Sequence, residues 1–138
     1  MTREELLKFL QSKRFVVLAS ASEGGQPEAA AMGVAVNQEF ELVFDTIGTS
    51  RKVANLRKNP RIAFVIGWDD GKTAQYEGIA EELSGEDLQK YKPLYFEAFP
   101  DGPEREQWPN ITYFVVRPSW IRYSDFSVRP PEITEFNF

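Results

Sequence analysis

The chain has 138 residues and a formal net charge of −5, and 42% of its residues are hydrophobic. This length fits one domain spanning residues 1–138, and the acidic balance argues against nucleic-acid binding. The chain contains no Cys and no His, which excludes disulfides, thiolate catalysis, Ser-His-Asp triads and His- or Cys-bound metals. We therefore expect no metal site, and any chemistry must come from carboxylates, Arg, Lys, Tyr or a cofactor.

The first predicted element is a helix over residues 2–12, because Thr2 and Glu5 make a capping box ahead of apolar residues at helical spacing. No apolar run reaches the ~20 residues that cross a bilayer, and the acidic start is unlike a signal peptide. We expect a cytoplasmic protein without a membrane partner. Apolar runs predict strands at residues 15–21, 28–36, 39–46, 61–68, 73–83, 110–118 and 120–126.

The spacing of these strands predicts the fold class. Residues 28–36 and 39–46 are separated by a short polar turn, which favours a hairpin. Two more helices are predicted, one over 49–59 and one from Ser84 to about Phe99. Residues 100–109 are expected to form a loop, and the Pro-rich tail from Ser127 is expected to be irregular. Strands that outnumber helices favour a mainly β domain, an antiparallel barrel with flanking helices.

A basic segment stands out in this acidic chain. From Thr46 to Trp68 there is no Asp or Glu, and the basic residues are Arg51, Lys52, Arg57, Lys58 and Arg61. Arg51 and Lys52 occupy the first turn of the predicted helix, where the dipole disfavours each cation by roughly 0.3–1 kcal/mol. A bound anion would remove this conflict, because backbone N–H groups, the Ser50 hydroxyl and both cations would converge on it. The alternative is a solvated basic helix face.

Several segments together resemble a known family. The order QPEAAAMGVAV, LVFDT, GTSRKVANLRKNPRIAFVIGW, GIAEELS and VVRPSWIRYSDF resembles the FMN-binding split-barrel proteins related to pyridoxamine 5′-phosphate oxidase. The resemblance covers about residues 5–126, and its most specific part is F-x-T-x-x-x-S-R-K followed by N-P-R-I-A. It implies a six-stranded antiparallel split barrel that forms a homodimer with composite FMN sites. It also implies an FMN-dependent oxidoreductase with an unidentified small-molecule substrate.

The resemblance also assigns site residues. Ser50, Arg51 and Lys52 would bind the FMN phosphate, and the strand Ala30–Gly33 would lie along the isoalloxazine ring. Thr73, Gln75 and Trp108 would reach the flavin from the partner chain. The expected cofactor-binding residues are Ala30, Ala31, Met32, Gly33, Asp45, Thr46, Ser50, Arg51, Lys52, Thr73, Gln75 and Trp108. No catalytic residue is assigned.

Two of these assignments have structural alternatives. Small side chains at Ala29 to Ala31 would let a flat ring approach the backbone, but they would equally suit a tightly packed barrel interior. Thr46 could bind the flavin or simply end a strand.

The chain departs from the oxidases themselves. Ala30 and Ala35 stand where those enzymes carry an Arg and a Lys, and their His-bearing terminal segment has no counterpart here. We therefore expect no vitamin B6 oxidase activity, and haem-handling relatives with a His ligand are disfavoured. The alternatives to a flavin oxidoreductase are a non-catalytic flavin carrier, sensor or stress protein, a deazaflavin-dependent reductase, and an interaction domain without a cofactor.

Overall fold

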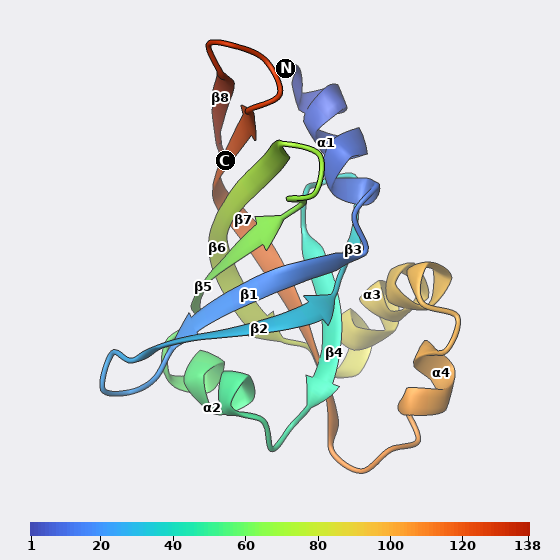
Figure 1. Cartoon of the computed structure of the whole chain (residues 1–138). Helices are drawn as coiled ribbons and strands as arrows, with labels where there is room; N and C mark the ends of the chain where they lie inside the picture. Colours follow the sequence, from blue (N-terminus) through green and yellow to red (C-terminus); the bar gives the residue numbers. More distant parts are fainter.

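The protein is built on one antiparallel sheet of eight strands. The computed structural model describes all residues, 1–138, and Figure 1 shows the sheet curling around its core. The strand order is β2-β1-β5-β6-β7-β4-β3, and β8 pairs with β7. The strands are β1 (Phe15–Ala21), β2 (Pro27–Gly33), β3 (Ala35–Val36), β4 (Leu42–Ile47), β5 (Arg61–Ile66), β6 (Lys72–Glu82), β7 (Ile111–Asp125) and β8 (Glu132–Asn137).

Four helices flank the sheet: α1 (Arg3–Gln11), α2 (Arg51–Lys58), α3 (Gly85–Ala98) and α4 (Gly102–Arg105). Helix α2 lies below the ends of β1 and β2, whereas α3 and α4 lie on the far side of β4 (Figure 1). The predicted capping box of α1 is confirmed, because Thr2 and Glu5 exchange both hydrogen bonds. None of the four helices has the length and apolar character that spanning a membrane requires.

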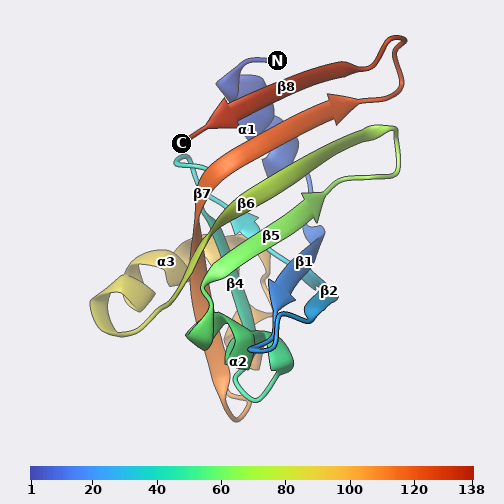
Figure 2. The same ribbon diagram turned by 90° about the vertical axis from the view of Figure 1, so that its left-hand side faces the viewer.

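The strands bury one face and leave the other free. Val16 and Leu18 on β1 are fully buried, whereas Phe15 on the same strand is 68% exposed. On β5, Phe64 is buried and Val65 is 40% exposed. This period-two alternation is typical of a sheet that covers a core on one side. Figure 2 shows that no helix covers the outward face of β1, β5 and β6. The predicted split-barrel fold class is confirmed, with eight strands rather than six.

The prediction of two strands at 110–118 and 120–126 is wrong, because one strand, β7, runs through both. Pro118 lies at a β-bulge, where the pairing register of β6 and β7 shifts between Glu77 and Gly78. A bulge tolerates proline, since the ladder hydrogen bond is already interrupted there. A Cβ atom on Gly78 would lie 2.3 Å from the Arg117 carbonyl oxygen, so the bulge requires glycine at this position.

The C-terminal tail and the 100–109 segment also differ from expectation. The tail forms β8 over Glu132–Asn137, and Phe136 on this strand is buried. The tail is a strand because it pairs with β7. The local sequence of the tail does not indicate this pairing with a strand elsewhere in the fold. The predicted loop contains the short helix α4.

The expected hairpin is shorter than predicted. The run 28–36 is divided into β2 and β3 at Val34, whose N–H donates to the Arg14 carbonyl at 3.0 Å. The strand predicted from residue 39 begins only at Leu42, because Phe40 lies in a turn with φ of 63°. Only two residue pairs, Ala35 with Val43 and Val36 with Leu42, therefore join β3 to β4.

Candidate functional site

The N-terminus of helix α2 offers unused hydrogen-bond donors. Ser50 is the N-cap residue, but its hydroxyl accepts no hydrogen bond from the first turn, which contains no acidic residue. The first N–H groups of a helix have no acceptor within it. The N–H groups of Arg51, Lys52 and Val53 are therefore free to bind an anion.

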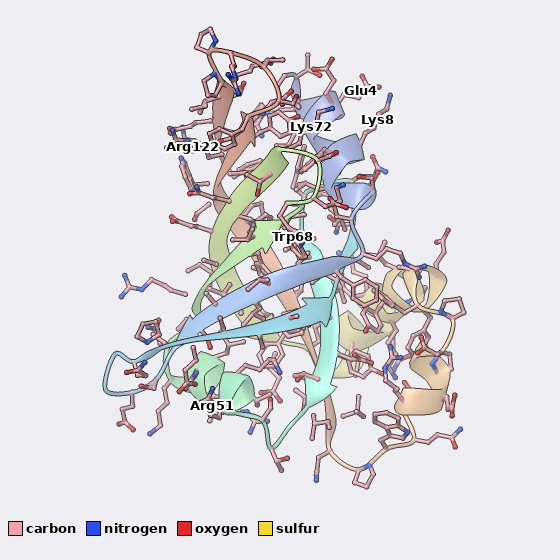
Figure 3. All side chains as sticks on the ribbon, viewed as in Figure 1. Glu4, Lys8, Arg51, Trp68, Lys72 and Arg122 are labelled. Carbon is pink, nitrogen blue, oxygen red and sulfur yellow. The ribbon has the colours of Figure 1, made fainter.

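A small pocket lies between this helix end and strands β1 and β2. Its volume is about 230 Å³, and its lining residues are Leu18, Ser20, Glu28, Ala29, Ala30, Ser50, Arg51 and Lys52. The structure thus brings four of the predicted flavin residues, Ala30, Ser50, Arg51 and Lys52, to one cavity. Figure 3 shows Arg51 on α2, below β1 and β2.

Lys52 lines this pocket, and Thr46 is connected to it by hydrogen bonding. The Lys52 Nζ donates a hydrogen bond to the Thr46 hydroxyl at 3.2 Å, and that hydroxyl lies 3.5 Å from the Ser50 hydroxyl. Lys52 makes no ion pair, and partial burial lowers the pKa of its ammonium group. An ammonium group held away from water without a carboxylate partner is stabilised by a bound anion. Thr46 is therefore part of a polar cluster and does more than end a strand.

A buried polar network at the same pocket was missed by the sequence prediction. Arg51 Nη1 lies 3.3 Å from Glu28 Oε2, and the Glu28 side chain is only 15% exposed. The Asn55 amide donates to Glu28 Oε1 at 2.8 Å and to the buried Ser20 hydroxyl at 3.0 Å. One signal could have revealed Glu28: it stands two residues from Ala30 on the same strand, so both side chains point to the same face.

The structure supplies carboxylates to three of the five basic residues. Arg51 pairs with Glu28, Arg57 pairs with Glu82 at 2.8 Å, and Lys58 pairs with Glu23 at 2.6 Å. The segment lacks acidic residues only along the sequence, because these partners come from other parts of the chain. Lys52 and Arg61 are the two cations of the segment without an acidic partner. Lys52 and the N-terminus of α2, rather than the whole basic segment, therefore favour a bound anion.

Asp45 does not join the pocket. Its carboxylate accepts hydrogen bonds from the Tyr95 hydroxyl at 2.7 Å and from Arg105 Nε at 3.0 Å. Burial and the neighbouring Asp45 raise the pKa of Tyr95 well above its ordinary value. Arg105 also pairs with Asp101. The Asp45 side chain therefore attaches helices α3 and α4 to β4, and it does not line the candidate site.

The residues predicted to act from a partner chain lie away from the pocket. Thr73 and Gln75 are on the outward-facing side of β6, opposite in alternation to the buried Ala74 and Tyr76. Strands β1 and β5 separate β6 from β2, a distance of about 14 Å at ~4.8 Å per strand. Trp108 is 49% exposed in the segment after α4 and does not line the pocket. None of the three reaches the pocket of its own chain.

Strand β2 presents small residues outward. Ala29 and Ala31 are exposed, so the alternative of a tightly packed barrel interior is wrong for both. Met32 packs against the core instead. A Cβ atom at Gly33 would lie 2.6 Å from the Phe99 ring, so packing against that ring already accounts for a glycine there. No cluster of carboxylates in the chain could hold a metal ion.

The sequence profile of the pyridoxamine 5′-phosphate oxidase family matches residues 2–125. The chain belongs to this family. No curated protein sequence matches it. Among solved structures, the conserved hypothetical protein Rv2991 from Mycobacterium tuberculosis is 25% identical, with a TM-score of 0.76. That match covers 91% of this chain and 85% of the other.

Two further structures share the fold of this member of the pyridoxamine 5′-phosphate oxidase family. One is a pyridoxamine 5′-phosphate oxidase-related, FMN-binding protein from Nostoc punctiforme, 13% identical with a TM-score of 0.73, covering 98% of this chain and 93% of that one. The other is the haem storage protein HutZ from Vibrio cholerae, 19% identical with a TM-score of 0.74, covering 85% and 89%. At these identities, both likenesses show the fold alone.

Proposed function

We propose that this protein binds FMN and is an FMN-dependent oxidoreductase of the pyridoxamine 5′-phosphate oxidase family. The observation that carries the proposal is the convergence of donors on one pocket: free N–H groups of α2, the Ser50 hydroxyl and the unpaired Lys52 ammonium. Each favours a phosphate group, and helix N-termini are common phosphate sites. The pocket lies beside Ala30, on the strand that the family resemblance assigns to the flavin ring.

The size of the pocket fits the phosphate end of FMN better than the whole cofactor. Its 230 Å³ is below the ~300–1,000 Å³ typical of pockets that enclose a small-molecule ligand. The isoalloxazine ring would therefore lie outside it, along the free edge of β2, which pairs with a neighbour, β1, on one side only. A ring placed there is open on one side unless something covers it.

A second copy of the chain would provide that cover. The outward sheet face carries Phe15, 68% exposed, and Val65, 40% exposed, and no helix shields them (Figure 2). Uncovered apolar faces of this kind mark interaction sites. Thr73 and Gln75 lie on the same face and would then be presented to the partner's flavin. The proposal is a homodimer with composite sites.

Bound FMN would supply the redox chemistry itself, by accepting and releasing hydride or electrons. The chain's residues would bind and orient the cofactor: Lys52, Ser50 and the first-turn N–H groups would hold the phosphate, and β2 would set the ring position.

The substrate differs from that of the vitamin B6 oxidases, because Ala30 and Ala35 replace their Arg and Lys. His and Cys, two common protein ligands of haem iron, are both absent from this chain, which favours FMN over the haem named for the storage protein HutZ.

The visible absorption spectrum of the purified protein tests this function. We expect a yellow protein with a flavin spectrum, or one that becomes so after addition of FMN, and chromatography of the released cofactor separates FMN from a deazaflavin. Reduction of the bound flavin by NADH or NADPH, followed by reoxidation over many turnovers, supports an oxidoreductase. A flavin that binds but never turns over indicates a carrier or sensor. A protein that gains no colour and no thermal stability with FMN contradicts the proposal.

A further inference from the structure

The phosphate pocket contains an acid as well as two bases. Among its lining residues are the cations Arg51 and Lys52 and the carboxylate of Glu28. Counting one charge for each, 1 + 1 − 1, the pocket walls carry a net charge of +1. Cations and N–H donors bind phosphate, whereas a carboxylate in the same pocket repels it.

The Glu28 carboxylate is fixed in place, and its partner Arg51 is not. Glu28 is 15% exposed and accepts a 2.8 Å hydrogen bond from Asn55, which is itself buried and bonded to Ser20. The Arg51 side chain is 76% exposed and is held only by Glu28, at 3.3 Å. A long exposed side chain with one ion pair reorients at little cost. The Arg51 side chain can therefore reorient to pair with a phosphate, whereas the Glu28 carboxylate stays in its position.

We propose that Glu28 is an internal anion that competes with the ligand phosphate for Arg51 and lowers the affinity of the pocket. The inference rests on the proposed phosphate site and goes beyond it, because it names the residue that limits how tightly that site binds. An incoming phosphate must take Arg51 from Glu28 and then sit beside the remaining negative charge. The bound cofactor consequently exchanges more readily than it would in a pocket without this carboxylate.

The variant Glu28→Gln tests the inference, because glutamine removes the charge and keeps an oxygen for the Asn55 hydrogen bond. Glu23→Gln is the matched control: it removes the same charge from an ion pair with Lys58 at the other end of α2. FMN, riboflavin and inorganic phosphate are the probes. Flavin affinity is measured by fluorescence quenching, and phosphate affinity by the amide NMR shifts of Arg51, Lys52 and Val53.

We expect Glu28→Gln to tighten FMN and phosphate by at least about fivefold, which is the effect of removing one unit of like charge at about 4 Å from each ligand charge in water. Riboflavin, which has no phosphate, should bind the variant and the wild type equally, and Glu23→Gln should change nothing. Unchanged or weaker phosphate binding in Glu28→Gln, including no detectable binding, overturns the inference. If phosphate tightens but neither protein binds FMN, the inference stands and the proposed flavin function fails.

Discussion

Two neighbouring cations at the start of α2 differ in their surroundings. Lys52 is half-buried, bonded to Thr46 and unpaired with any acid, whereas Arg51 is 76% exposed and already paired with Glu28. Exposed ion pairs contribute little, while hydrogen bonds from partly buried charged groups contribute about 1.5–3 kcal/mol. If the pocket binds phosphate as proposed, we therefore expect Lys52 to contribute more to the affinity than Arg51 does.

Substitution of each cation should separate their roles. Lys52→Met removes a charge-assisted hydrogen bond, so we expect FMN affinity to fall roughly tenfold to a hundredfold. Arg51→Ala should cost less than about fivefold, because the guanidinium is exposed. Fluorescence titrations with FMN and riboflavin measure both effects, and riboflavin affinity should stay unchanged. An equal loss for riboflavin would show that Lys52 supports the fold or the ring instead of the phosphate.

Lys52 should also make the proposed FMN binding depend on pH. Burial lowers the pKa of its ammonium group, so the free protein loses this charge below the ordinary lysine value of about 10.4. A bound phosphate favours the protonated form, so FMN affinity should be constant near pH 7 and fall as the pH rises toward 10. Lys52→Arg keeps its charge throughout this range and should flatten the profile. A wild-type titration that stays flat to pH 10 would contradict the role given to Lys52.

The lowered pKa of Lys52 has opposite effects on FMN affinity and on folding stability as the pH rises. At a pH between the folded and unfolded pKa values of Lys52, the unfolded chain binds more protons, so this residue makes stability rise with pH. Loss of FMN affinity in this range would therefore not reflect unfolding caused by Lys52. Thermal melts of the free protein over the same pH series provide the comparison.

Sequence reasoning could predict only part of this site. Ser50, Arg51 and Lys52 are consecutive, and the start of a helix has recognisable local signals, so their grouping was accessible. Glu28 lies 27 residues from its partner Asn55, and only the tertiary fold brings the two together. Asp45 precedes Thr46 directly, yet strand alternation and the approach of α3 direct its carboxylate elsewhere. The spacing of Glu28 and Ala30 indicates a shared strand face, but the contacts of Glu28 and Asp45 with distant residues depend on tertiary structure.

The same limit applies to the secondary-structure elements. Strongly patterned elements, such as α1, β1 and β5, have the predicted positions to within a few residues. Two of the errors fall where strand pairing overrides local signals: β7 was predicted as two strands, and β8 was predicted to be an irregular tail. Both strands exist because a neighbouring strand holds them.

The bulge at Gly78 provides a test at this level. Gly78→Ala places a methyl group where it would lie 2.3 Å from a carbonyl oxygen of β7, so the two longest strands must separate or shift. We expect the free energy of unfolding to fall by about 3 kcal/mol, measured by urea denaturation. Gly24→Ala is the control, because no atom lies within 4 Å of its new methyl group. Equal stability of the two variants would mean that the bulge adapts freely.

At the scale of the whole molecule, the outward sheet face would determine whether the proposed flavin site is complete. Val65 and Val128 are the same residue type with similar exposure, 40% and 44%, but only Val65 lies on this face. We expect Val65→Glu to dissociate the proposed dimer and to weaken FMN binding, because a charge would be buried in the interface. Val128→Glu should leave both unchanged. Light scattering gives the mass of each variant, and a wild-type monomer that binds FMN would rule out composite sites.

The segment that carries α3 and α4 connects the end of β6 to the start of β7, and these two strands are hydrogen-bonded neighbours next to the connection. Glu82 on β6 pairs with Phe114 on β7, and the Leu83 N–H donates to the Tyr113 carbonyl at 2.8 Å. Because the ends of this segment are already joined, doubling its length would cost only about 0.6 kcal/mol in loop entropy. Provided that Tyr95 and Phe99 keep their buried positions, evolution or an engineer can rebuild this module without disturbing the register of any strand.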